Sequence, residues 1–207
     1  SDVCSSDLIR RDLRGWVPTL VDAEGGWRPT YFELSFGLGL DAAHDPRSRR
    51  EPVTLDGRFT LRGAVDLVEA RAHDGALRIT DHKTGRNRHK TQIRIDGGRT
   101  LQPVIYALVV EQIAGAPVVE SRLSFCTAGG GYAVVPADLG AEGRRSGIEA
   151  LEIVDRAVEQ GQLMAAPASG ACAWCDFRAV CGPNVEARVA RKMDDRLRDL
   201  HELRSRP

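Results

Sequence analysis

The stretch Leu77-Arg78-Ile79-Thr80-Asp81-His82-Lys83-Thr84-Gly85 is the most informative part of this chain. Its first four residues predict a short strand, and an acid, one spacer and a lysine follow at the end of that strand. Because alternate residues of a strand share a face, the side chains of Asp81 and Lys83 leave together. A second acid, Asp66, ends the upstream run Gly63-Ala64-Val65-Asp66. Two converging carboxylates can hold a divalent metal, and a lysine beside them can bind a phosphate or position a water.

The same residues also fit an exposed strand end followed by a turn. Asp, Thr and Gly are ordinary turn residues, and the pattern Asp-x-Lys taken alone favours this plainer interpretation. The surrounding sequence is therefore needed to decide between them.

The composition is that of an ordinary globular protein. Of the 207 residues, 42% are hydrophobic and 28% are charged, with 29 Lys and Arg against 29 Asp and Glu. A formal net charge of zero gives no global attraction to nucleic acid, so any DNA affinity has to come from a local patch. No apolar run is long enough to span a bilayer and no signal peptide is visible, so we expect no membrane partner and a cytoplasmic location.

The order of predicted elements indicates an α/β domain. Alternation and turn signals predict strands over 31–40, 77–80, 118–125 and 132–135, with Phe32, Leu34 and Phe36 on one face of the first. A hairpin is predicted over 53–69, with Asp56-Gly57 as its turn. Helices are predicted over 8–21, over 100–113 with Thr100 as N-cap, over 140–160 and over 184–203. The large apolar residues predict the buried face of the third helix: Ile148, Leu151, Val154, Ala157 and Val158.

The chain divides into three parts. Residues 1–8 lack a Met and resemble the translation of a sequencing-adapter end, so we treat them as a non-native segment and expect the natural chain to continue upstream. Residues 9–165 form the predicted α/β core. Residues 166–207 hold a cysteine-rich segment and a final helix that we expect to pack on the core.

Two polar residues follow on the next predicted helix. Gln102 and Tyr106 are four apart and so share one face, where they can contact a phosphate or a base. Taken singly, Tyr106 is more typical of core and Gln102 of a solvated surface. Between strand and helix the chain is locally basic and can either grip a DNA backbone or form a solvated loop; its cations are Arg86, Arg88, Lys90, Arg94 and Arg99.

Together these residues resemble the PD-(D/E)xK nuclease superfamily, and most closely its RecB/AddB/Cas4-like branch. The resemblance rests on the ordered series Gly63-x-x-Asp66, Asp81-x-Lys83-Thr84-Gly85 and Gln102-x-x-x-Tyr106, and covers roughly residues 31–189. It implies a restriction-endonuclease-like core, a mixed central sheet flanked by helices. It also implies that Asp66 and Asp81 bind Mg²⁺ or Mn²⁺, that Lys83 is catalytic, and that Gln102 and Tyr106 lie beside the active site.

The resemblance implies two further metal contacts and exposes one departure. The backbone carbonyl of His82 is expected to bind the metal, and Glu33 stands where an upstream acid often occurs, although the solvent face of a strand explains Glu33 equally simply. Members of this branch commonly carry a metal-binding histidine ahead of the first strand. In this chain the first histidine is His44, which follows that strand.

The run Cys172-x-x-Cys175-x₅-Cys181 is the second strong signal. Three crowded cysteines in a chain with an odd total of 5 indicate a metal or cluster site more than a disulfide framework. Zinc sites usually offer a second Cys or Cys/His pair, whereas a [4Fe–4S] cluster needs four ligands. The resemblance implies such a cluster on these three cysteines plus a distant upstream one, with Trp174 and Phe177 as its shield. The alternative is three reduced structural thiols.

The function expected from the resemblance is metal-dependent hydrolysis of DNA, of exonuclease type, in repair or recombination. Single-stranded DNA or free ends are the expected substrates, with a helicase subunit or domain as a partner. Two alternatives stay open: a non-catalytic, iron–sulfur DNA-binding module of a helicase–nuclease complex, and a Cas4-like nuclease in CRISPR adaptation.

Overall fold

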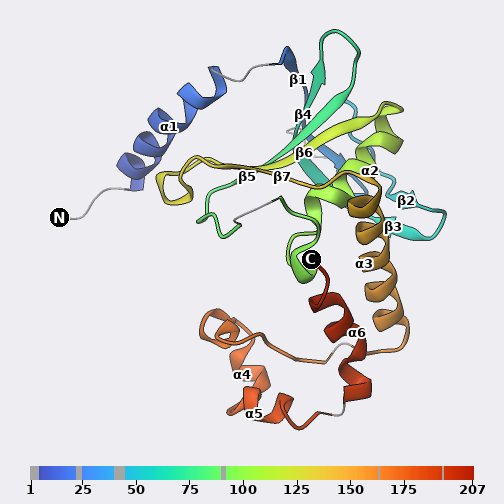
Figure 1. The fold of residues 1–207 in the computed structure, drawn as a ribbon. Helices are drawn as coiled ribbons and strands as arrows, with labels where there is room; N and C mark the ends of the chain where they lie inside the picture. The colour runs from blue at the N-terminus through green and yellow to red at the C-terminus, as the bar shows by residue number, and fades with distance from the viewer. Residues whose placement is uncertain (1–4, 22–24, 40–44, 90–91, 163, 193) are drawn as a thin grey trace.

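The structure, a computed structural model, describes residues 5–21, 25–39, 45–89, 92–162, 164–192 and 194–207. Its centre is a five-stranded sheet in the order β1-β4-β5-β6-β7 (Figure 1). β5 and β6 run parallel and the other neighbouring pairs run antiparallel, so the predicted mixed sheet flanked by helices is confirmed. The strands of this sheet are β1 (Trp27–Phe36), β4 (Gly63–Arg71), β5 (Leu77–Lys83), β6 (Val118–Phe125) and β7 (Val134–Pro136).

The parallel pair depends on α2 (Gln102–Ala114), which carries the chain from the end of β5 back to the start of β6. Parallel neighbours need a crossover of this kind. The helix is predominantly apolar, and its residues Val109 and Val110 are fully buried in the core between helix and sheet. This packing holds the first turn of α2 beside the end of β5, where Asp81 and Lys83 stand.

The start of α2 differs from the prediction. Thr100 was the expected N-cap, but the cap residue is Leu101, which makes no side-chain capping bond. The backbone N–H of Thr100 instead donates to the carbonyl of Ile95 at 3.2 Å, so Thr100 belongs to the turn that follows the short 3₁₀ helix Asp96–Gly98.

The first strand is shifted toward the N-terminus of the predicted range. Glu33 adopts a left-handed backbone conformation with φ 49°, which breaks the alternation of side chains along β1. As a result Phe32 is 57% exposed, whereas Leu34 and Phe36 are buried. The expectation that all three aromatic and aliphatic side chains share one face is therefore wrong.

The predicted hairpin divides between two sheets. β2 (Val53–Leu55) and β3 (Phe59–Leu61) pair with each other around the predicted Asp56-Gly57 turn and form a separate two-stranded sheet. The chain then leaves this sheet at Arg62, and β4 joins the central sheet. Residues predicted as one continuous strand are thus two strands in different sheets.

Helix α3 (Ala141–Glu159) packs on α2 through small residues. A Cβ added at Gly147 would lie 2.8 Å from Cγ1 of Val104, so the two helices approach at a distance that only glycine allows. The face predicted from the large apolar residues is confirmed only in part: Ile148 and Leu151 pack against the core, whereas Val154 and Val158 are 39% and 53% exposed. Counting large side chains misses a contact made by glycine and alanine.

The C-terminal segment contains two helices where one was predicted over 184–203. α5 (Val185–Val189) ends before α6 (Asp194–Arg204) begins. The break allows α6 to pack along α3, where Arg156 donates hydrogen bonds to Asp199 at 2.9 Å and to Glu202 at 3.0 Å.

Helix α1 (Ser5–Val21) confirms the helix predicted over 8–21 and begins inside the segment 1–8. It lies against the turn between β6 and β7 (Figure 1): the backbone N–H of Ala128 donates to Asp12 at 3.1 Å, and Gly15 packs directly on the ring of Tyr132. None of the described helices is both long and apolar enough to cross a bilayer.

Candidate active site

The site forms where β4 and β5 stop pairing. Their antiparallel ladder ends at the pair Leu67 and Thr80, so Asp66 and Asp81 are the first residues beyond it on the two strands. The backbone N–H of His82 is no longer bonded to a β4 carbonyl, and the Oδ2 atom of Asp66 accepts its hydrogen bond at 2.7 Å. The end of the ladder therefore brings the two predicted acids together and fixes the orientation of one of them.

Asp81 is a buried acid, only 8% exposed. The ammonium of Lys83 lies 2.6 Å from its Oδ2, but at an angle that leaves this oxygen without a well-formed hydrogen bond among the described residues. Burial raises the pKa of Asp81; Lys83 acts in the opposite direction, and the nearby charge of Asp66 raises the pKa further. The site thus holds a carboxylate oxygen whose charge the protein compensates incompletely.

Lys83 connects the strand to the helix. Its Nζ donates a hydrogen bond to Oε1 of Gln102 at 3.1 Å, and Nε2 of Gln102 donates to the hydroxyl of Tyr106 at 3.4 Å. The tyrosine ring packs edge-on against Phe36, and a Cβ at Gly63 would lie 3.0 Å from its hydroxyl, so only glycine leaves this space. The predicted face of α2 therefore points at the end of β5.

The donor atoms suit a small divalent cation. Asp66 and Asp81 supply hard carboxylate oxygens, and Mg²⁺ is commonly held by one or two carboxylates together with water and substrate phosphate. Oδ2 of Asp81 accepts no well-formed hydrogen bond from the described residues and has the ammonium of Lys83 beside it, so it is an oxygen that a bound cation could share with the lysine. The described residues contain no group of three or more His, Cys, Asp or Glu side chains that could hold a metal, so the further ligands to expect are the predicted carbonyl of His82, the predicted Glu33, water or substrate.

Glu33 remains apart from this pair. It stands on β1 at the register position opposite Asp66, between the pairs Phe32–Leu67 and Leu34–Val65. Its carboxylate is exposed and makes no hydrogen bond or ion pair with the described residues. A role for Glu33 as a metal ligand stays a prediction that depends on its register position alone.

The imidazole of His82 faces away from Lys83 and contacts α1. Trp16 packs edge-on against it, with ring centres 5.3 Å apart, and Nδ1 lies 3.8 Å from Oδ2 of Asp66. Burial lowers the pKa of His82, while the charge of Asp66 opposes that shift. Sequence reasoning missed Trp16, because nothing in the local pattern of α1 indicates which strand its indole will reach.

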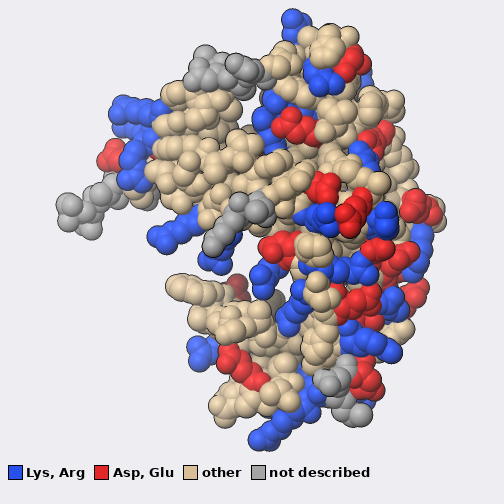
Figure 2. All heavy atoms as spheres, in the orientation of Figure 1, with Lys and Arg blue, Asp and Glu red and all other residues tan. Residues whose placement is uncertain are grey.

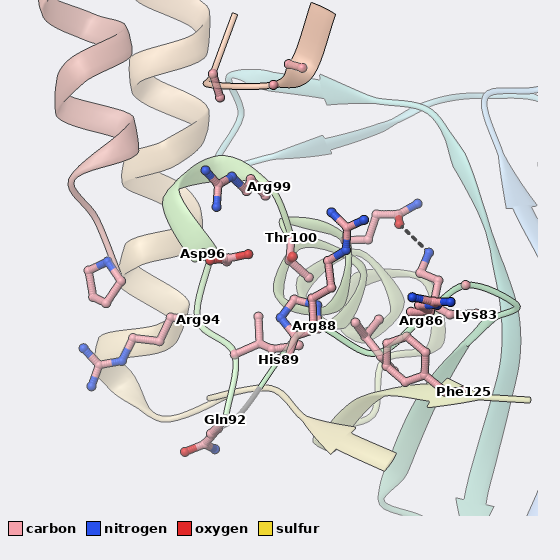
Figure 3. A pocket seen from close by; sticks show the side chains of 18 of the residues that line it. Lys83, Arg86, Arg88, His89, Gln92, Arg94, Asp96, Arg99, Thr100 and Phe125 are labelled. Atoms are coloured by element: carbon pink, nitrogen blue, oxygen red, sulfur yellow. Dashed lines mark hydrogen bonds between the residues drawn. The ribbon is translucent and has the colours of Figure 1, made fainter. Parts of the chain in front are cut away.

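A cleft of about 1160 Å³ opens beside the site and includes Lys83 and Gln102 in its wall. The basic segment between β5 and α2 lines it, and Lys and Arg side chains surround the hollow in Figure 2. Arg86 and Arg88 line the same cleft as Lys83, and Figure 3 shows the three side chains in its wall. Together with Arg99 they make no ion pair with any carboxylate of the described residues, so their charge is available to a polyanion.

One arginine of this segment is already engaged. Arg94 extends away from Lys83 (Figure 3) and pairs with Asp138 and Glu142, each at 2.9 Å. Lys90, another predicted member of the basic stretch, falls outside the described residues. The available positive charge of the cleft therefore lies mostly on its arginines.

The three clustered cysteines do not form a site in the described part of the chain. Cys172 and Cys181 are partly exposed and Cys175 is exposed; all are free thiols, and they belong to no group that could hold a metal. Trp174 and Phe177 are 92% and 70% exposed, so the expectation that they shield a cluster is wrong for this arrangement. The reason is local: no residue of the short helices Ala171–Trp174 and α4 (Arg178–Cys181) is buried.

This arrangement of thiols does not fit an iron–sulfur cluster, which needs four converging ligands. Cys4 and His44 lie outside the described residues. Cys126 lies at the end of β6, where its Sγ is 3.4 Å from the carbonyl of Ser124, and burial raises the pKa of its thiol.

The comparisons with known proteins give one finding. The family model of the PD-(D/E)XK nuclease superfamily matches residues 6–182, which include the whole central sheet, α2, α3 and the three clustered cysteines. A search of curated proteins returned no match to this chain.

Proposed function

Because the chain belongs to the PD-(D/E)XK nuclease superfamily, we propose that it hydrolyses phosphodiester bonds in DNA with a divalent cation, Mg²⁺ or Mn²⁺, held by Asp66 and Asp81. The observation that carries this proposal is the meeting of Asp81, Lys83 and Gln102 at the wall of a basic cleft. A structural ion pair alone would not need a cleft beside it, or three guanidinium groups along the approach that pair with no carboxylate of the described residues.

In the proposed hydrolysis of a phosphodiester, the cation, Lys83 and the attacking water have separate roles. When bound, the cation polarises the phosphoryl oxygen and makes a bound water more acidic. Lys83 holds a positive charge 2.6 Å from Asp81, close enough to orient the attacking water and to balance charge that develops on the phosphate. Water attacks phosphorus, the bond to the leaving oxygen breaks, and that oxygen gains a proton.

Gln102 and Tyr106 act through Lys83 in this proposal. The hydrogen bond from Lys83 to Gln102 restricts the lysine to one direction, and Tyr106 restricts the amide in turn. A side chain with four rotatable bonds is held in the working geometry by this pair. We therefore regard Gln102 and Tyr106 as positioning residues, and Gln102, which lines the cleft, can also contact substrate.

A cleavage assay with defined metals tests this proposal. Labelled single-stranded and duplex DNA are incubated with the protein in Mg²⁺, in Mn²⁺ and in EDTA. We expect cleavage in the metals, none in EDTA, and a loss of about 10²–10⁴-fold in Lys83→Ala. Arg145→Ala, which removes an exposed cation on α3 outside the cleft, serves as the charge-matched control. Equal rates in Lys83→Ala and wild type would remove the lysine from the mechanism.

A second candidate is a DNA-binding module without catalysis. It is favoured by the finding that the described residues supply no metal-binding group of three side chains. The same assay separates the two functions: DNA binding by a protein that cleaves in no metal, while folding is intact, would favour the module.

The finer assignments rest on the resemblance and the cysteine spacing. They comprise the RecB/AddB/Cas4-like branch, exonuclease action on single strands or free ends, a repair role beside a helicase, and a [4Fe–4S] cluster on Cys172, Cys175 and Cys181. Cluster binding would require the exposed segment to refold around the thiols and a further ligand. Iron analysis and visible absorption of anaerobically purified protein test it, and a colourless, iron-free protein would exclude the cluster.

A further inference from the structure

The wall of the cleft opposite the sheet is made by the cysteine segment, which contributes Ala168, Gly170 and Trp174. Trp174 is 92% exposed and makes no aromatic or cation–π contact with the described residues. An indole buries a large apolar area when it finds a partner, so an almost bare tryptophan in the wall of a charged cleft is an unusual arrangement.

The charge of the cleft specifies the kind of partner. Arg86, Arg88 and Arg99 line the same cavity as Trp174, and none of them pairs with a carboxylate in the part of the chain that the structure describes. An apolar peptide would leave these three charges unsatisfied, and a simple anion would leave the indole bare. A ligand that presents phosphates at regular intervals and flat aromatic faces between them satisfies both kinds of group, and a nucleic acid strand is such a ligand.

The exposed indole further distinguishes a single strand from a duplex. In a duplex each base already stacks on its neighbours and offers its face to no side chain, whereas the bases of a single strand are free to stack on an aromatic ring. We infer that the cleft binds a single-stranded segment, with one base stacked on Trp174 and the backbone running along Arg86 and Arg88 toward Lys83. Only the direction toward Lys83 rests on the proposed function.

Binding measured without metal tests this inference independently of cleavage. Fluorescently labelled oligothymidylate, an abasic oligonucleotide of the same length and a duplex are titrated in EDTA. Trp174→Ala should weaken oligothymidylate binding about tenfold, leave the abasic strand and the duplex unaffected, and be rescued largely by Trp174→Phe. Phe177→Ala is the matched control, because Phe177 is an exposed aromatic of the same segment that does not line the cleft.

The outcomes distinguish the stacking inference from the proposed nuclease function. Unchanged oligothymidylate binding in Trp174→Ala overturns the inference, as does an equal loss in Phe177→Ala or an equal loss for the abasic strand, since either would indicate a structural effect of the segment. If the stacking signature is present and the protein cleaves no DNA in any metal, the inference stands and the proposed nuclease function fails. If the protein cleaves DNA and the stacking signature is absent, the proposed nuclease function stands and the stacking inference fails.

Discussion

Asp81 is suited to its proposed role as a metal ligand, but its burial lowers the stability of the metal-free protein. Its carboxylate is buried and its pKa is raised, chiefly because burial disfavours the charged form. In the unfolded chain the same group ionises at the ordinary aspartate pKa. Between the ordinary and the raised pKa the folded protein binds more protons, so the free energy of unfolding falls as the pH rises through this interval and stays reduced above it.

We therefore predict that Asp81→Asn stabilises the metal-free protein at neutral pH. The substitution removes a buried charge, while Lys83 remains exposed enough to be solvated. Thermal unfolding in EDTA should give a higher Tm for the variant at pH 7, and the difference should close as the pH falls below the ordinary aspartate pKa. Added Mg²⁺ should raise the Tm of the wild type and not that of the variant. A lower Tm for the variant at pH 7 would contradict this assessment of Asp81.

At the scale of elements, the approach of α3 to α2 positions the helix that carries Gln102. Gly147 allows this approach, and Val104 opposite it is completely buried and cannot move aside. Alanine would gain about 1 kcal/mol in helix propensity but would overpack the contact at a cost of about 1–3 kcal/mol. The packing of residue 147 against Val104 therefore decides whether the substitution raises or lowers the free energy of unfolding.

We predict that Gly147→Ala lowers the free energy of unfolding by up to about 2 kcal/mol, because the clash outweighs the propensity gain. Denaturant unfolding measures the change. Ser146→Ala, one residue away on the same helix, is the control and should be neutral or slightly stabilising. Stabilisation by Gly147→Ala would show that the helices can separate without cost.

The sequence predicted some features of these elements well and missed others for identifiable reasons. β6 occupies the predicted residues 118–125, and the four-residue spacing of Gln102 and Tyr106 placed both on the face that meets Lys83. These features depend on local periodicity. The left-handed residue Glu33 and the contact of Trp16 with His82 depend on tertiary packing, which no local pattern contains.

The chemical roles of the site residues stay predictions, although the structure shows that Asp81, Lys83, Gln102 and Tyr106 adjoin one another. The cysteine segment shows what the sequence alone does not predict. The spacing of Cys172, Cys175 and Cys181 together with the family resemblance predicts a cluster, but a cluster also needs the chain to converge and a further ligand, and spacing specifies neither.

At the scale of the whole molecule, acidic and basic side chains balance, so the protein carries no large net charge. The chain is neutral overall, so attraction to DNA requires a local patch of positive charge, and we propose the cleft, where Arg86, Arg88 and Arg99 pair with no carboxylate of the described residues. Each guanidinium that contacts a phosphate releases counterions and makes binding depend on salt.

We predict that the double substitution Arg86→Ala and Arg88→Ala reduces the slope of log K against log salt concentration by about 1–2. Anisotropy titrations of single-stranded DNA at several salt concentrations in EDTA measure the slope. Arg145→Ala should leave the slope unchanged, because that arginine lies on α3 outside the cleft. An unchanged slope in the double variant would place the DNA elsewhere on the protein.

The assignment of the active site to the ends of β4 and β5 is tested most directly by the single-turnover rate of DNA cleavage by Asp81→Asn in saturating Mg²⁺. Wild type and Asp56→Asn are the comparisons, because Asp56 is an acid in the exposed turn between β2 and β3. The account predicts that Asp56→Asn cleaves like wild type, whereas Asp81→Asn loses at least about 10²-fold in rate while remaining folded. Cleavage by Asp81→Asn at the wild-type rate would contradict the claim that the ends of β4 and β5 form the active site.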